Sequence, residues 1–303
     1  MSEQIAPANG IEIAYEAYGD PADPTLLLVM GLGVQMLLWD EELCQMFVER
    51  GFNVVRFDNR DVGLSTKTPG RPPNVLPALV RRPRKSAYRL SDMADDAAAL
   101  LDHLQVEAAH VMGASMGGMI AQTLAANHPQ RVLSLVSIMS TTGNRRVGRA
   151  KPGALALLVN RPPQGREENV ERAAKAFKVI GSPGFERDEA RLRDVIGRSY
   201  DRCFHPAGVA HQLVAIMASG NRTSELRSIQ SPTLVIHGED DPLVGVSGGR
   251  ATARAIPDAR LMTIPGMGHD MPRQIWPRMV EAVVANAQRA RDKHPADAAP
   301  AAR

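Results

Sequence analysis

The stretch Val111-Met112-Gly113-Ala114-Ser115-Met116-Gly117-Gly118 joins two segments of different periodicity. Residues 108–113 form a short apolar run typical of a buried strand, and residues 116–127 have the composition of a helix. Gly-x-Ser-x-Gly at such a junction is the pattern of a sharp turn that exposes a serine hydroxyl, because the small flanking residues let strand and helix approach each other. Ser115 is therefore a candidate nucleophile, and the alternative is a plain glycine turn.

Short apolar runs alternate with helical periodicity on both sides of this turn. Alternation of this kind predicts an α/β fold with a mostly parallel, doubly wound sheet. An alternating segment that begins at Ile11 and ends in the turn residues 18–21 predicts an edge hairpin. Further strands are expected at 25–30, 53–57, 108–113, 132–140, 233–237 and 260–264, and helices at 40–50, 91–104, 116–127, 247–255 and 274–290.

The middle of the chain differs from both ends. Residues 144–227 contain no strand-like run and show helical spacing in pieces, which predicts a helical cap inserted into a core made of residues 1–143 and 228–290. The Pro- and Arg-rich residues 69–84 are expected to form an irregular surface loop, and the Ala-rich residues 291–303 a disordered tail.

Composition excludes several classes of protein. The 303 residues are 44% hydrophobic, which is enough to bury a large core, and the net charge of +3 does not indicate a nucleic-acid partner. The two cysteines, Cys44 and Cys203, stand far apart without other metal-ligand residues nearby, so we expect no disulfide scaffold, no metal and no cofactor. The N-terminus lacks the pattern of a secretory signal, and no apolar run approaches the roughly 20 residues that span a bilayer. We therefore expect a cytoplasmic protein without a membrane partner.

A serine hydroxyl needs a base and a group that orients the base. When the serine lies in a strand-to-helix turn of this kind, the chain order is serine, acid, histidine. Of the eight histidines, only His269 and His294 follow the strand expected at 233–237. His294 lies in the Ala-rich tail, whereas His269 lies in a glycine-rich loop directly after a predicted strand. His269 is therefore the candidate base, and the alternative is a surface histidine.

The candidate acid lies in Gly238-Glu239-Asp240-Asp241-Pro242, which follows the strand at 233–237. Asp241 is favoured because the proline after it disfavours helix and fixes an extended exit from the strand. Asp240 is the alternative. The backbone N–H groups of Met116, after the nucleophile, and of Leu32, in an early glycine-flanked loop, are the candidate donors to an oxyanion.

We expect the walls of a substrate pocket to carry flexible thioethers and no aromatic ring. The chain has 14 Met but only six Phe, four Tyr and two Trp. A methionine-rich lining can repack around ligands of different shape. The expected wall residues are Leu32, Met36, Met116, Met139, Leu213, Met217 and Leu243.

Five motifs in this order resemble the α/β-hydrolases over residues 10–142 and 230–290: Met30-Gly31-Leu32-Gly33, residues 58–65, residues 113–118, residues 238–242 and Gly268-His269. Two positions depart from the family pattern. Asp61 replaces the usual glycine of a D-x-R-G-x-G-x-S turn, and Met30 stands where many members have His. Within the family the chain is similar to small serine esterases of the aclacinomycin methylesterase type. A serine at position 115 disfavours haloalkane dehalogenases and epoxide hydrolases, which need an aspartate there.

The resemblance implies that a small-molecule ester is cleaved through an acyl-enzyme on Ser115, with Asp241 and His269, without a cofactor. Two alternatives stay open. The same three residues could support related acyl chemistry, namely hydrolysis of an enol-lactone or a carbon–carbon bond, or the perhydrolysis of cofactor-free haloperoxidases. A ligand receptor without catalysis on the same fold is the remote alternative.

Overall fold

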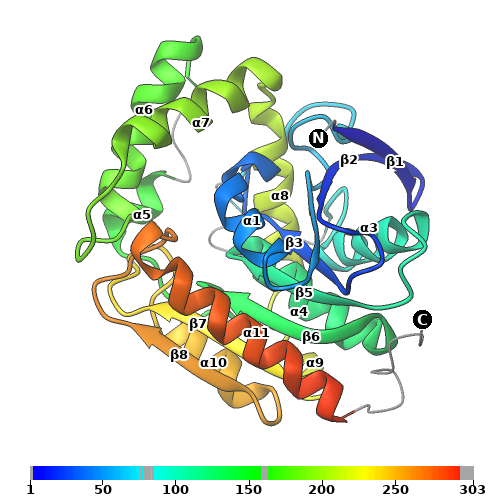
Figure 1. The fold of residues 1–303 in the computed structure, drawn as a ribbon. Coiled ribbons are helices and arrows are strands. Elements are labelled where there is room, and N and C mark those ends of the chain that lie inside the picture. The colour runs from blue at the N-terminus through cyan, green and yellow to red at the C-terminus, as the bar shows by residue number, and fades with distance from the viewer. Residues whose placement is uncertain (1–2, 76, 78–82, 84, 158–162, 294–303) are drawn as a thin grey trace.

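The computed structural model describes residues 3–75, 77, 83, 85–157 and 163–293 (Figure 1). Their strands form an eight-stranded sheet in the order β1-β2-β4-β3-β5-β6-β7-β8. The pairings β1–β2 and β2–β4 are antiparallel and all others are parallel, so a hairpin lies at one edge of a mostly parallel sheet. The strand expected from Ile11 belongs to this hairpin, but the hairpin turns at residues 9–10 and not at the predicted turn 18–21. The strands are β1 (Gln4–Ala8), β2 (Ile11–Tyr18), β3 (Thr25–Val29), β4 (Asn53–Phe57), β5 (Ala109–Ala114), β6 (Val132–Ile138), β7 (Thr233–Gly238) and β8 (Arg260–Ile264).

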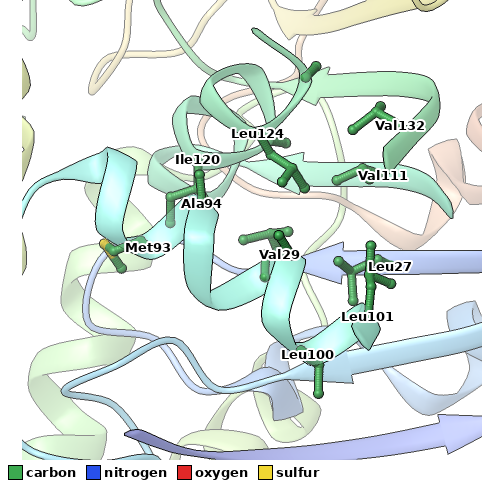
Figure 2. Close-up of a cluster of buried hydrophobic side chains, with 14 of the residues drawn as sticks. Leu27, Val29, Met93, Ala94, Leu100, Leu101, Val111, Ile120, Leu124 and Val132 are labelled. Atoms are coloured by element: carbon green, nitrogen blue, oxygen red, sulfur yellow. The ribbon is translucent and has the colours of Figure 1, made fainter. Parts of the chain in front are cut away.

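Helices cover both faces of the sheet. Every residue of β3, β4, β5 and β7 is buried, as expected of parallel strands with both faces covered. Side chains alternate along β3: Leu27 and Val29 pack with the helices α3 and α4, and Leu26 and Leu28 pack with α1 and α11. Figure 2 shows the first of these clusters. The helices are α1 (Glu41–Val48), α3 (Leu90–His103), α4 (Met116–Asn127), α10 (Ser247–Ala255) and α11 (Trp276–Lys293), with short turns η1 (Met36–Leu38), η2 (Pro129–Arg131) and η3 (Arg273–Ile275).

The regular elements that the structure describes between β6 and β7 are all helices, joined by turns and irregular segments. These helices are α5 (Pro152–Leu157), α6 (Arg166–Ile180), α7 (Glu189–Arg202), α8 (Pro206–Ser219) and α9 (Thr223–Leu226). Figure 1 shows α5, α6 and α7 standing to one side of the sheet, whereas α8 returns to pack against α3. Several ion pairs tie α7 to the core, among them Arg191 with Asp40 at 2.5 Å and Arg202 with Asp58 at 2.6 Å.

The C-terminal helix differs from the sequence prediction. Residues 291–293, expected in a disordered tail, continue α11, whose inner face buries Ala287 and Ala290. Residues 294–303 lie outside the described part of the chain, as do residues 76, 78–82 and 84 of the expected Pro- and Arg-rich loop. No helix among the described residues has both the length and the apolar composition to cross a membrane.

Candidate active site

Ser115 occupies the tight turn between β5 and α4. Its backbone has φ 57° and ψ −117°, a region that residues with a side chain rarely adopt. A Cβ atom at position 117 would lie 2.0 Å from the carbonyl oxygen of Val29, and one at position 113 would lie 2.2 Å from that of Gly117. Only glycine fits at either position, and the close approach of β3, β5 and α4 leaves the serine at the edge of the sheet.

The register of the sheet brings the candidate residues together. Val29 pairs with Gly113, and Ile138 pairs with both Ala114 and Ile236, so the carboxyl ends of β3, β5, β6 and β7 meet at one edge. The loops that leave these strands, together with the loop after β8, therefore converge at Ser115. Binding sites of open parallel sheets lie at this edge.

A continuous chain of hydrogen bonds joins the serine, the histidine and an aspartate. His269 Nε2 lies 2.9 Å from Ser115 Oγ, and His269 Nδ1 lies 2.7 Å from Asp241 Oδ2. Both residues are buried: 7% of the surface of His269 and 3% of the surface of Asp241 are exposed. The structure thus brings together the three residues that the sequence suggests as candidate nucleophile, base and acid.

The two candidate acids have different partners. The second oxygen of Asp241, Oδ1, accepts hydrogen bonds from the backbone N–H groups of Leu243 and Val244, both at 2.8 Å. Asp240 is exposed, and its Oδ2 accepts a hydrogen bond from the backbone of Gly266 at 2.9 Å. Asp241, and not Asp240, contacts His269.

A second histidine, which the sequence analysis missed, lies against Asp241. His237 Nε2 is 3.5 Å from Asp241 Oδ2 and donates a hydrogen bond to the carbonyl of Val244 at 2.6 Å. Burial lowers the pKa of His237, opposed by that hydrogen bond and by the charge of Asp241. His237 thus packs against the side of Asp241 that also contacts His269. Its position at the end of β7 is typical of core residues, so the sequence alone carries no functional signal for it.

The loop between β3 and η1 lies directly over Ser115. A Cβ atom at Gly31 would lie 3.3 Å from Ser115 Cβ. Within the described part of the chain, the N–H groups of Leu32 and Met116 have no hydrogen-bond acceptor. The next N–H, of Gly33, donates to Gln212 Oε1 at 2.7 Å, and Gln212 Nε2 donates to the carbonyl of Arg60 at 2.8 Å. Gln212, a buried residue of α8 that the sequence analysis also missed, therefore fixes this loop.

Ser115 and His269 open into a cavity of about 840 Å³. The core and the helical insertion both contribute to its walls. Of the residues predicted to line it, Leu32, Met139 and Leu243 do so. Four other predicted residues are not among the described residues that line it: Met36, Met116, Leu213 and Met217.

The physical reasons for these four differences are the packing of α8 and of the chain around Ser115. Met36 and Met116 are fully buried, and Met116 points into the cluster that α3 and α4 share with the sheet. Leu213 is 2% exposed on α8, and Met217 is half-buried on the same helix. Because α8 packs against α3 rather than over the cavity, neither residue reaches the cavity wall.

The expectation of a lining without aromatic rings is wrong. Phe177 of α6, Phe185 after it and Trp276 of α11 line the cavity. No local signal in the sequence assigns these residues to the cavity, because α6 and the start of α11 are far from Ser115 along the chain.

The rest of the wall contains a group of charged residues. Asp270, next to the histidine, is among them, and burial raises the pKa of its carboxyl, opposed by a hydrogen bond from Ser182 and by the charge of Arg187. Among the described residues, no three His, Cys, Asp or Glu side chains are grouped to hold a metal ion. The charged lining residues are Asp40, Glu186, Arg187, Asp188, Glu189, Arg191, Asp270 and Arg273.

Comparison with known proteins gives consistent matches. The model of the alpha/beta hydrolase fold family matches residues 24–272. Rhodomycin D methylesterase DnrP of Streptomyces peucetius is 30% identical over 96% of this chain and 99% of its own length. The 3-oxoadipate enol-lactonase 2 of Acinetobacter baylyi is 28% identical over 80% of this chain and 81% of its own length.

A solved structure agrees with these sequence matches. The crystal structure of a hydrolase from Pseudomonas aeruginosa is similar with a TM-score of 0.69 and 26% identity, covering 95% of this chain and 98% of that one. The methylesterase relatives and the fold support ester hydrolysis. The sequence motifs, the sheet and these matches agree. We conclude that the chain belongs to the α/β-hydrolase family and is a hydrolase.

Proposed function

We propose that this hydrolase cleaves carboxylic esters through an acyl-enzyme intermediate formed on Ser115. The observation that carries the proposal is the hydrogen-bonded chain from Ser115 Oγ through His269 to Asp241. Nucleophile, base and orienting acid stand in the order and contact that this chemistry needs. The near full-length similarity to a protein named as a methylesterase supports the choice of an ester.

Each residue has a separate task in this mechanism. Asp241 accepts a hydrogen bond from His269 Nδ1–H, which keeps the ring proton on Nδ1 and leaves the Nε2 lone pair facing Ser115 Oγ. His269 takes the hydroxyl proton as Oγ attacks the ester carbonyl, and then delivers it to the leaving alcohol. The N–H groups of Leu32 and Met116 are the proposed donors to the oxyanion, because they have no acceptor in the described chain. In the second step, water gives a proton to His269 and attacks the acyl carbon. The bond between that carbon and Ser115 Oγ breaks, the acid is released, and His269 returns the proton to Oγ.

The substrate we infer is the methyl or other short-alcohol ester of a bulky, largely apolar acid. A cavity of about 840 Å³ is large enough to enclose a molecule of drug size. Phe177, Phe185 and Trp276 offer flat apolar area for a ring system in the acid part. The name of the methylesterase relative agrees with a small leaving alcohol.

Hydrolysis of an enol-lactone is the second candidate, because a protein named as an enol-lactonase is similar over 80% of this chain. The same three residues would act, but the leaving oxygen would remain attached to the acid. A panel of activated esters, lactones and thioesters, with detection of the acyl-enzyme by mass, separates the two candidates. An ester hydrolase should cleave the open-chain esters and release their alcohols, whereas a lactonase should prefer the lactones.

The proposal is tested with Ser115→Ala. We expect kcat on any accepted ester to fall by about 10⁴- to 10⁶-fold, because the nucleophile is lost while its glycine turn remains. Labelling by a fluorophosphonate probe should disappear. Ser228→Ala is the matched control, since Ser228 is exposed and its hydroxyl bonds the carbonyl of Glu225 and no other group in the described part of the chain. Activity of Ser115→Ala within tenfold of the parent enzyme would refute the assignment.

A further inference from the structure

A turn of the helical insertion lies against the loop that carries His269. The turn, residues 180–184, is here named the strap, and residues 266–270 are named the histidine loop. The backbone N–H of Gly184 donates to the carbonyl of Gly266 at 2.9 Å, and the N–H of His269 donates to the carbonyl of Ile180 at 2.7 Å. The two segments are 86 residues or so apart in sequence, so these bonds exist only in the folded chain.

Glycines let the two backbones touch. A Cβ atom at Gly268 would lie 2.3 Å from the carbonyl oxygen of Gly181, and one at Gly184 would lie 2.6 Å from Gly266 Cα. Real Cβ atoms do not approach other heavy atoms this closely. The strap and the histidine loop are therefore held at a separation that no larger residue at these positions would allow.

One side chain of the strap binds the histidine loop on both sides of His269. Ser182, 4% exposed, accepts a hydrogen bond from the N–H of Gly268 at 2.9 Å and donates its own proton to Asp270 Oδ1. A hydroxyl has one proton to donate and lone pairs to accept, so the two bonds satisfy it in a defined direction. Gly268 precedes the histidine and Asp270 follows it. A single hydroxyl thus fixes the residues before and after the base.

We propose that Ser182 and Asp270 are positioning residues that hold the backbone of His269 so that its imidazole is aimed at Ser115. This inference rests on the proposed role of His269 as the base. The helical insertion then acts on the chemistry and not only on the shape of the cavity. Ile180, Ser182 and Asp270 also line the cavity, so a bound substrate contacts the same residues that hold the base.

A double-mutant cycle of Ser182→Ala and Asp270→Ala tests the proposal. We expect each single variant to lower kcat by about 10- to 100-fold, since a misplacement of the order of 1 Å has that effect on a reacting group. The double variant should lose no more activity than the single variant with the larger loss, because both changes break the Ser182–Asp270 hydrogen bond. Asp270→Asn keeps an acceptor oxygen and should retain most of the activity that Asp270→Ala loses.

Ser199→Ala is the matched control in the same insertion, because among the described residues Ser199 Oγ bonds the carbonyl of Val195 in its own helix and no other group. Its kcat should equal that of the parent. A second readout is independent of turnover: the low-field proton resonance of His269 Nδ1–H should shift or broaden in Ser182→Ala but not in Ser199→Ala. Thermal unfolding of each variant shows whether it is folded.

Three results would overturn the proposal: additive losses in the double variant, a kcat of Ser182→Ala within twofold of the control, or an unchanged proton resonance. If Ser182→Ala does not fold, equal losses in Asp270→Asn and Asp270→Ala would overturn it as well. A failure of the proposed function can be told apart from a failure of this inference. If the proposed function is wrong, Ser115→Ala stays active, and the His269 resonance in Ser182→Ala still shows whether the strap positions the histidine.

Discussion

Replacing Asp241 by asparagine should prevent His269 from acting as a base, because it should move the ring proton of His269 from Nδ1 to Nε2. In the parent, Asp241 Oδ1 accepts two backbone N–H groups at 2.8 Å, from Leu243 and Val244. An asparagine must keep its only oxygen at that position, because an NH₂ group there would face two donors. The NH₂ group is then turned toward His269 Nδ1. It can only donate, so His269 must carry its proton on Nε2, facing Ser115, where it cannot accept one.

The expected loss follows from this change of tautomer. In serine proteases the corresponding exchange lowers kcat by about 10⁴-fold while the geometry stays intact. At 1.36 kcal/mol for each factor of ten, this is about 5 kcal/mol of transition-state stabilisation. Asp241→Asn conserves the shape of the buried side chain and both backbone hydrogen bonds, so the loss should appear in kcat and not as unfolding.

Asp240→Asn is the matched control, one residue away in the same loop. Its carboxylate is exposed and accepts one hydrogen bond, from Gly266, which an amide oxygen can also accept. We expect its activity to stay within a few-fold of the parent on a p-nitrophenyl ester, with both variants checked by thermal unfolding. Activity of Asp241→Asn within tenfold of the parent, or a greater loss in Asp240→Asn, would refute the reasoning.

Two further predictions concern stability. Gly117→Ala should yield little folded protein, or protein destabilised by about 3 kcal/mol, the upper end of the usual cost of overpacking, because the added Cβ would lie 2.0 Å from the Val29 carbonyl oxygen. Urea unfolding measures the effect, with Gly153→Ala as the control because its added Cβ meets no atom within 4 Å. Equal stabilities of the two variants would contradict the prediction. Burial lowers the pKa of His110 from 6.5 to about 4, so between these values the unfolded chain binds a proton that the folded chain does not. The contribution of His110 to the free energy of unfolding, about 3 kcal/mol, is complete above pH 6.5 and is lost as the pH falls to 4. The free energy of unfolding of His110→Asn should therefore depend less on pH than that of the parent. Parallel plots of this free energy against pH would count against the prediction.

The residues around the nucleophile could be predicted because sterics are encoded locally. The glycines at 113 and 117 are required by contacts of 2.2 and 2.0 Å that any side chain would make, so the motif and the turn imply each other. The helix expected at 116–127 coincides with α4. The proline after Asp241 likewise predicted which of the two neighbouring aspartates contacts His269. Each of these inferences depends on a residue and its immediate neighbours.

The cavity walls could not be predicted in the same way. Periodicity shows which residues of a helix share a face, but not what that face packs against. Ala215 and Ile216 of α8 pack with the cluster that contains α3 and α4, so Leu213 and Met217 on that helix do not reach the cavity. The cavity takes part of its wall instead from α6, α7, the turn between them and the start of α11. The aromatic rings that the sequence analysis did not expect come from α6, that turn and α11.

The same limit hides the residues that hold the site in place. Gln212 is 179 residues from Gly33, which it fixes, and Ser182 is 86 residues from Gly268. Neither belongs to a motif, since a glutamine or a serine in a helical insertion is ordinary in composition. Yet the first holds the loop of the proposed oxyanion donor Leu32, and the second holds the loop of His269. Two side chains of the insertion therefore bond loops that border Ser115, so the insertion does more than shape the cavity. Exchanging the insertion for one of equal volume, without these two side chains, would leave Ser115 in its turn but would remove the supports of both loops that serve it.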